Sequence, residues 1–157
     1  MQNVIETESQ QTKHKTPREV LLGWENAYNN RDPYDLIELY AEDAEVVQVA
    51  FGDVSLKGRK ELLESFIKFF KAFPDNYTNL ENLFVDGDWA IIEWNGGGTF
   101  TGEMDDAQPT GKSFKLRGCG FFHVIEGKIK FQRGYFDKQT WFGQIGLTGE
   151  GTSETKL

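Results

Sequence analysis

Residues 112–137, KSFKLRGCGFFHVIEGKIKFQRGYFD, decide the fold class of this chain. Apolar side chains alternate with polar residues or glycine on both sides of Glu126-Gly127, which is typical of strands with one buried face. Glu126-Gly127 itself predicts the turn of a hairpin. The residues that follow, KQTWFGQIG at 138–146, predict a short helix. The chain therefore closes with an antiparallel hairpin and a helix.

Helices precede this hairpin. Thr16 and Glu19 form a capping-box pattern with Pro17 between them, which predicts the start of a long helix. Residues 32–43 predict a second, shorter helix, and residues 59–72 predict a third. The early part of the chain is therefore mainly helical.

The remaining segments predict strands. Residues 44–53 have the pattern of one strand, and residues 79–103 have the pattern of two strands joined by a turn at residues 86–88. Early helices followed by a meander favour an α+β fold. We expect a cone-shaped, curved antiparallel sheet wrapped around the long N-terminal helix. An apolar cavity between the sheet and the helix is the natural ligand site.

One domain accounts for the 157 residues. Residues 1–15 and 149–157 are polar and without periodicity, so we expect two disordered tails around a single domain at 16–148. The net charge of −8 disfavours nucleic acid and anionic membranes as partners. No apolar run reaches the length of a membrane span, and a cytoplasmic protein is the default.

Cofactor and metal chemistry have no motif in this sequence. Cys119 is the single cysteine, so no internal disulfide and no cysteine-rich metal site can form. The sequence has no phosphate-binding loop and no Ser/His/Asp arrangement. We therefore expect neither a cofactor nor a metal, and we expect a small hydrophobic molecule as the ligand.

Five segments carry a resemblance to a known family: WENAYNNRD, LYAEDAEV, GGTFTGE, PTGKSFKLRG and FFHVIEGKIKFQRGYFD. Together they resemble the SnoaL-like polyketide and ester cyclases of the nuclear-transport-factor-2-like fold. The likeness extends over about residues 16–147. The same segments are similar to limonene epoxide hydrolase and, more loosely, to the steroid delta-isomerases. The resemblance implies a cone-shaped fold and cofactor-free acid/base chemistry.

Asp137 is the first candidate catalytic residue. It occupies the position that the resemblance assigns to a catalytic acid/base, at the end of the Tyr-Phe-Asp strand. An apolar environment would raise the pKa of this carboxyl group and make it a better base. The alternative is structural, because Asp137 also stands where it would cap the following helix.

His123 is the second candidate catalytic residue. The resemblance places a His one strand before the catalytic Asp, and a His–Asp pair would share a proton and steer an enolate oxygen. A one-residue bulge at Gly127 would put His123 and Phe121 on the same face as Tyr135 and Asp137. A two-residue turn would place them on opposite faces.

Basic residues near Asp137 offer a different interpretation. Lys115, Arg117 or Arg133, if they share its face, would pair with Asp137 and lower the pKa of its carboxyl group. Asp137 would then belong to a structural ion pair.

The candidate substrate-binding residues are mostly aromatic. Trp24 and Tyr28 lie one helical turn apart and would point from the long helix into the cavity. Gln48 lies within an apolar strand, where its amide needs a hydrogen-bond partner such as a ligand. Tyr135 and Phe121 complete the set. The alternative for the aromatic residues is an ordinary core.

The family patterns are only partly retained. Gln48 stands where the steroid isomerases have a catalytic Asp, and Trp24 stands at the position of their oxyanion-binding Tyr. Phe100 replaces a His that many ester cyclases carry. Of these patterns only Asp137 with His123 remains.

The sequence therefore predicts a cofactor-free acid/base enzyme that acts on a small hydrophobic carbonyl compound. Asp137 would abstract a proton from carbon and His123 would hydrogen-bond the enolate. A non-catalytic protein that binds a small molecule in the same cavity is the main alternative. An epoxide-hydrolase-like reaction is another, and it would need a second acid such as Glu93.

Glycines on the closing hairpin predict a homodimer. Gly118, Gly120 and Gly134 would face outward and leave one sheet face smooth, so that a second copy could pack on it. The alternative is that these glycines accommodate sheet curvature.

Overall fold

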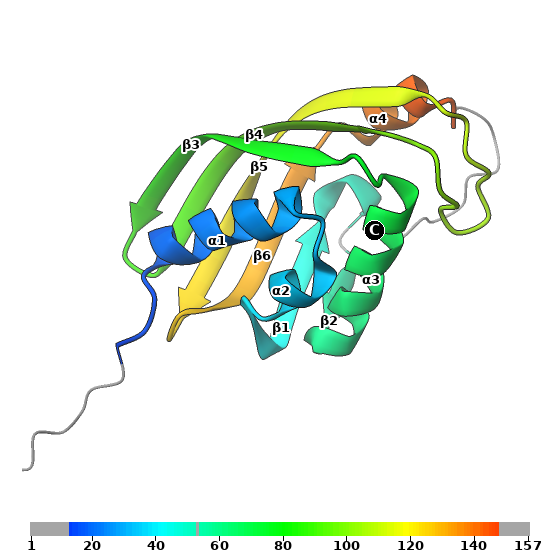
Figure 1. The fold of residues 1–157 in the computed structure, drawn as a ribbon. Helices are drawn as coiled ribbons and strands as arrows, with labels where there is room; N and C mark the ends of the chain where they lie inside the picture. The colour runs from blue at the N-terminus through cyan, green and yellow to red at the C-terminus, as the bar shows by residue number, and fades with distance from the viewer. Residues whose placement is uncertain (1–12, 53, 148–157) are drawn as a thin grey trace, which may run out of the picture.

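A computed structural model of the chain describes residues 13–52 and 54–147. The tails expected at 1–15 and 149–157 lie outside the described residues, apart from residues 13–15. The fold is α+β, as predicted, with a curved, open sheet that carries three helices on one face and a fourth near its end (Figure 1). None of these helices, within the residues that the model describes, is long and apolar enough to cross a membrane.

The two long helices begin and end close to the predicted positions. Helix α1 is Pro17–Asn29, and its capping box is formed, with the Thr16 hydroxyl accepting from the Glu19 backbone N–H at 3.2 Å. Helix α3 is Gly58–Ala72. Both helices bury an apolar face against the sheet, which includes the following residues: Val20, Leu21, Trp24, Leu62, Phe66 and Phe70.

The second helix is much shorter than predicted. Helix α2 is only Pro33–Ile37, and strand β1 already begins at Tyr40. Tyr40 pairs with Ile129 across the sheet, and its hydroxyl bonds to Gln132. These long-range contacts outweigh the helical pattern of residues 38–43, because local propensity is a weak term.

Six strands form the sheet, in the order β2-β1-β6-β5-β4-β3. Their bounds, in that order, are Ser55–Lys57, Tyr40–Gln48, Lys128–Phe136, Ser113–Ile125, Trp89–Thr99 and Tyr77–Asp86. Every neighbouring pair is antiparallel except β1 and β6, which are parallel. The prediction of an antiparallel sheet is therefore wrong at this one pair. A short 3-10 turn, η1 at Val49–Phe51, follows β1, and helix α4 at Lys138–Ile145 closes the domain.

The β5–β6 hairpin has the two-residue turn that the sequence left open, and the bulge expected at Gly127 lies at Lys130 instead. Glu126 and Gly127 form a two-residue turn, each with positive φ (50° and 74°). The register then shifts between His123 and Val124, which leaves Lys130 as an extra residue on β6. Residues of equal parity share a face beyond this bulge. On β5, and on β6 from Phe131 onward, even-numbered side chains face the helices, whereas odd-numbered ones face outward.

The hairpin glycines are therefore on the inner face, and the prediction that they face outward is wrong. A Cβ atom at Gly118 would overlap the ring of Trp94, and one at Gly134 would overlap the side-chain oxygen of Gln48. These glycines make room for two side chains of the interior instead of a second subunit. The prediction of a homodimer can therefore no longer rest on outward-facing glycines.

Candidate functional site

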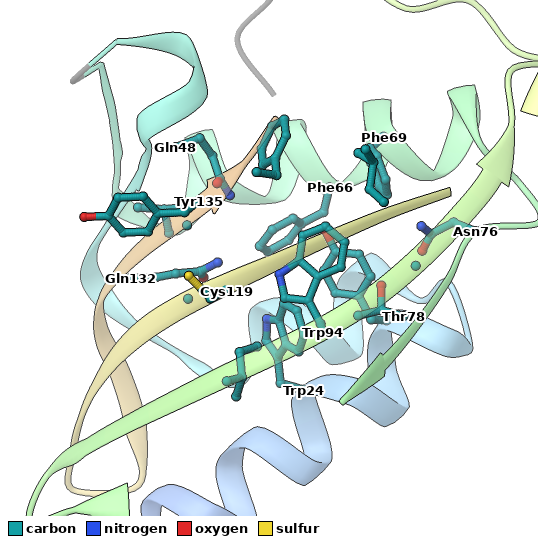
Figure 2. A pocket seen from close by; sticks show the side chains of 18 of the residues that line it. Trp24, Gln48, Phe66, Phe69, Asn76, Thr78, Trp94, Cys119, Gln132 and Tyr135 are labelled. Atoms are coloured by element: carbon teal, nitrogen blue, oxygen red, sulfur yellow. The ribbon is translucent and has the colours of Figure 1, made fainter. Parts of the chain in front are cut away.

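A cavity of about 130 Å³ lies between the inner face of the sheet and helices α1 and α3 (Figure 2). A cavity of comparable size, ~150 Å³, holds benzene in an engineered protein, so a small ring compound fits this scale. Much of the wall is aromatic, with rings from both helices, β4 and α4 that include the following: Trp24, Tyr28, Phe66, Phe69, Trp94 and Trp141. Such a wall favours an apolar, ring-bearing ligand.

A chain of three hydrogen-bonded side chains crosses the interior. Trp24 Nε1 donates to the Tyr40 hydroxyl at 3.0 Å, and this hydroxyl donates to Gln132 Oε1 at 2.6 Å. Both bonds are buried. Since the Gln132 carbonyl is occupied by Tyr40, its amide N–H groups are left to donate to a ligand, because Gln132 lines the cavity.

Gln48 supplies a second amide beside Gln132. Its side chain lies on Gly134, its neighbour on β6, where any larger residue would displace it. Its Oε1 atom is buried and has no hydrogen-bond partner among the described residues. A buried acceptor without a donor costs about 1–3 kcal/mol. Gln48 is therefore placed to bind something that enters the cavity.

Asn76 and Thr78 form another polar part of the wall. Asn76 is 3% exposed and Thr78 is 5% exposed. The Asn76 Nδ2 group donates to the Gly97 carbonyl at 3.5 Å, whereas its Oδ1 atom has no partner among the described residues. Trp141 Nε1 is likewise buried without a partner.

No Asp, Glu, His, Lys or Arg is present among the described residues that line the cavity. Tyr28 and Tyr40 are ionisable, but burial raises the pKa of both hydroxyls above their usual range. They therefore stay protonated and neutral at physiological pH. The groups that the cavity offers are uncharged donors and acceptors, with no strong base among them.

Asp137 lies outside this cavity, and the expected rise in its pKa is wrong. The side chain is exposed and caps helix α4, accepting from the Thr140 hydroxyl at 2.7 Å and from the Thr140 N–H at 3.2 Å. The hydroxyl bond, with help from the backbone bond, holds the pKa of the carboxyl group below its usual range. The capping alternative describes its position, and the geometry gives no support to a general base.

The low pKa of Asp137 predicts a pH-dependent stability. A carboxyl group with a lower pKa in the folded state stabilises the fold above its unfolded pKa of about 3.9, and this stabilisation is lost as pH falls through the folded value. We expect Asp137→Ala to lower Tm by about 2–4 °C at pH 7, and to have little effect at about pH 2. The Tm of Asp137→Asn, which keeps a capping group, should lie between those of the wild-type chain and Asp137→Ala at pH 7. Thermal melts between about pH 2 and pH 7 test this prediction. A Tm difference between the wild-type chain and Asp137→Ala that does not change with pH would contradict it.

The basic residues proposed as partners of Asp137 have other contacts. Arg117 pairs with Glu81 at 2.6 Å, and the Arg133 guanidinium lies 5.0 Å from the centre of the Phe131 ring. Within residues 13–52 and 54–147, neither these arginines nor Lys115 forms an ion pair with Asp137. The ion-pair interpretation is therefore wrong as well.

His123 lies on the outer face of the sheet, stacked on Trp89 with ring centroids 4.6 Å apart. It is opposite Phe131, and Asp137 follows Phe131 by six residues, a separation of about 20 Å along the strand. The predicted His–Asp pair therefore does not form. The parity rule was correct, but the shared face is the outer one.

The predicted substrate-binding residues divide into two groups. Trp24, Tyr28 and Gln48 line the cavity, although their binding role stays a prediction. Phe121 does not, because it faces outward and packs edge-on against Tyr135, with centroids 6.1 Å apart. Tyr135 borders the cavity, but its ring points away from the other labelled side chains (Figure 2).

Sequence reasoning missed the polar residues of the cavity. Tyr40 falls within the helix predicted at residues 32–43, and Asn76 lies between the helix predicted at 59–72 and the strands predicted at 79–103. Gln132 is the residue that the sequence could have indicated most clearly. It is polar, and its even number puts it on the same face of the hairpin as Phe122 and Gly134. Once the bulge is known, this parity places Gln132 on the inner face.

Comparisons with known proteins agree with the fold and define the family. The family model of SnoaL-like polyketide cyclases matches residues 18–145, so the chain belongs to this family. No curated protein matches the sequence.

Solved structures with this fold come from several bacteria. IdmH from Streptomyces antibioticus, provisionally a polyketide cyclase, is 25% identical, with a TM-score of 0.70 over 84% of this chain and 99% of that chain. A protein with a ketosteroid isomerase-like fold from Catenulispora acidiphila is 20% identical, with a TM-score of 0.71 over 85% of this chain and 96% of that chain. An LEH-like epoxide hydrolase of M. tuberculosis is 17% identical, with a TM-score of 0.65 over 80% of this chain and 86% of that chain.

Proposed function

We propose that this chain binds a small, uncharged, carbonyl-bearing ring compound in its cavity. The observation that carries the proposal is the cavity wall itself, where neutral amides and hydroxyls are set among aromatic rings. An ion would lose its hydration there without gaining a counter-charge from the described lining residues, which is costly. A carbonyl oxygen would accept from the free amide of Gln132, which the Tyr40 hydroxyl holds in place.

Family membership supports the same ligand class, since polyketides are carbonyl compounds. It also makes ring closure of the bound compound a second candidate function. The specific observation in its favour is the buried Trp24–Tyr40–Gln132 chain, which fixes a donor for a carbonyl oxygen that gains negative charge. Because the described lining residues offer no base, this candidate is a ring closure in which bonds form and break within the ligand without net proton loss, accelerated by holding a reactive conformation and by this donor.

An epoxide-hydrolase-like reaction receives less support. It needs an acid in the cavity to protonate the epoxide oxygen. Glu93, the residue first considered for this task, is exposed and accepts from the Asn82 amide at 3.3 Å. The described cavity lining therefore supplies no acid for this reaction.

A titration with three probes of similar size tests the binding function. Acetophenone is neutral, benzoate is an anion and benzylamine is a cation at pH 7. We expect acetophenone to quench the emission of the cavity tryptophans in a saturable way, and the two ions to bind about 100-fold more weakly. Equal binding of an ion, or no binding of acetophenone, would contradict the proposal.

A homodimer through the outer sheet face stays a prediction, now resting on apolar side chains. Trp89, Phe121 and Tyr135 are each more than one-third exposed on this face. A second copy would remove this surface from water. Sedimentation at micromolar concentration checks it, and a monomer would contradict it.

A further inference from the structure

The cavity has two polar ends with aromatic rings between them. Figure 2 shows Gln48 and Gln132 on one side and Asn76 and Thr78 on the other, with Trp94 and Phe66 between them. An elongated ring compound with one polar group at each end would match this arrangement. Each end holds a buried acceptor without a partner among the described residues, Gln48 Oε1 and Asn76 Oδ1, and the Gln132 amide adds a donor at the first end.

The Asn76 end offers an acceptor in a fixed position. Arg31 donates to the Asn76 backbone carbonyl at 2.8 Å, and the Asn76 backbone N–H donates to the Phe73 carbonyl at 3.0 Å. The side-chain Nδ2 is turned toward the Gly97 carbonyl. This leaves Oδ1 as the atom of the amide that has no partner within residues 13–52 and 54–147, in a side chain whose residue is 3% exposed.

The neighbouring backbone is held just as firmly. The Asn29 side chain, at the end of helix α1, accepts from the Thr78 N–H at 2.8 Å and donates to the Thr78 carbonyl at 2.7 Å. Asn76 therefore cannot easily turn away to find another donor. Since an unpaired buried acceptor is costly, a donor from a bound molecule is the natural complement.

We propose that Asn76 is a specificity-determining residue that selects ligands with an O–H or N–H donor at the end opposite their carbonyl group. The inference rests on the proposed binding function and narrows its ligand to hydroxylated or amino-substituted carbonyl compounds. A hydroxyl group donates to Asn76 Oδ1, whereas the carbonyl oxygen accepts from Gln132. A site built around a ligand hydroxyl rejects the analogue that lacks it, because the protein group is then left unpaired.

Two probes that differ in a single donor test this inference. 4-Hydroxyacetophenone carries a hydroxyl opposite its carbonyl, and 4-methoxyacetophenone replaces that hydrogen with a methyl group. We expect the wild-type chain to bind the hydroxy compound about 10- to 100-fold more tightly at about pH 6, where a phenol keeps its proton. Binding is measured by tryptophan emission, with acetophenone as the reference that has no para substituent.

Two matched variants assign the effect to one residue. Asn76→Leu should abolish the preference for the hydroxy compound over acetophenone, while Gln48→Leu should keep it. Equal binding of the hydroxy and methoxy compounds to the wild-type chain would overturn this inference and leave the binding function standing. Loss of the preference in Gln48→Leu alone would overturn the assignment to Asn76. No binding of any of the three ketones would overturn the binding function and this inference together.

The wild-type comparison does not depend on how well either variant folds. A preference that persists in a folded Asn76→Leu variant would overturn the assignment, since a water molecule or another acceptor would then satisfy the hydroxyl. A wild-type preference that Asn76→Leu removes supports it.

Discussion

Replacing Tyr40 by phenylalanine is expected to lower the free energy of unfolding by about 2–4 kcal/mol. Tyr40 is 1% exposed as a residue. Its hydroxyl accepts a hydrogen bond from Trp24 Nε1 and donates one to Gln132 Oε1. Its removal leaves one buried donor and one buried acceptor without partners, and each costs the desolvation of a polar group. The loss of packing is small, because phenylalanine fills nearly the same space.

Tyr28→Phe is the matched control for this change. Tyr28 also lines the cavity and packs on Trp24, with ring centroids 4.6 Å apart, but its hydroxyl has no hydrogen bond to the described residues. We expect this control to cost less than about 1 kcal/mol. Urea unfolding of both variants gives the comparison, and equal losses would contradict the role assigned to the Trp24–Tyr40–Gln132 chain.

Tyr40→Phe is also expected to weaken ligand binding. Without the hydroxyl, the Gln132 amide is free to rotate, so the carbonyl of a bound ketone loses its oriented donor. Acetophenone should bind about tenfold more weakly to Tyr40→Phe than to Tyr28→Phe. Identical affinities would show that Gln132 does not contact the ligand.

The sequence predicted the elements of this fold well, because their signals are local. The capping box at Thr16 and Glu19 and the turn at Glu126-Gly127 depend only on nearby residues, and both are present in the structure. The helix expected through residue 43 failed for the opposite reason. Tyr40 leaves the helical pattern to pair with β6, which lies about ninety residues later in the chain.

The candidate site was harder to predict, because it depends on which face of the hairpin is buried. The bulge at Lys130 puts His123 and Tyr135 on the same face, as expected. The alternation of Phe114 and Leu116 with Lys115 and Arg117 already indicates that this odd-numbered face is the outer one, but the expected site was placed on the inner face. The structure agrees with the alternation, since Phe122 and Leu116 pack inward. The hairpin glycines are even-numbered and therefore lie on this inner face. His123 is odd-numbered and therefore lies on the outer face, away from the cavity.

Asp137 illustrates a second limit of sequence reasoning. A carboxylate at the start of a helix and a carboxylate at the mouth of a cavity have the same local sequence. The two differ only in where the side chain points, which here is toward Thr140, three residues later. Thr140 was available as a signal, because an Asp followed three residues later by a hydroxyl-bearing residue forms a compact capping arrangement.

Filling the cavity should remove its function without unfolding the protein, and Ser65 is the position to do so. Ser65 is the one serine of helix α3 and lines the cavity beside Phe66 and Phe69. In Ser65→Phe the added ring takes space that a ligand would occupy. We expect affinity for acetophenone to fall at least about 100-fold, because a ligand would have to displace a packed side chain.

The thermal stability of Ser65→Phe should not fall, in contrast to its affinity for the ligand. A ring that enters existing empty space gains contacts with the aromatic wall, so we expect Tm to stay unchanged or to rise by about 2–4 °C. Ile67→Phe, two residues along the same helix at a position that is 39% exposed, adds a ring on the solvent side and should change neither quantity. Thermal melts and tryptophan titrations of the two variants separate occupation of the cavity from general effects on helix α3. If Ser65→Phe binds acetophenone as tightly as Ile67→Phe does, the ligand lies elsewhere. If it unfolds instead, the smaller Ser65→Leu repeats the test with less added volume, and it should still weaken binding more than Ile67→Phe.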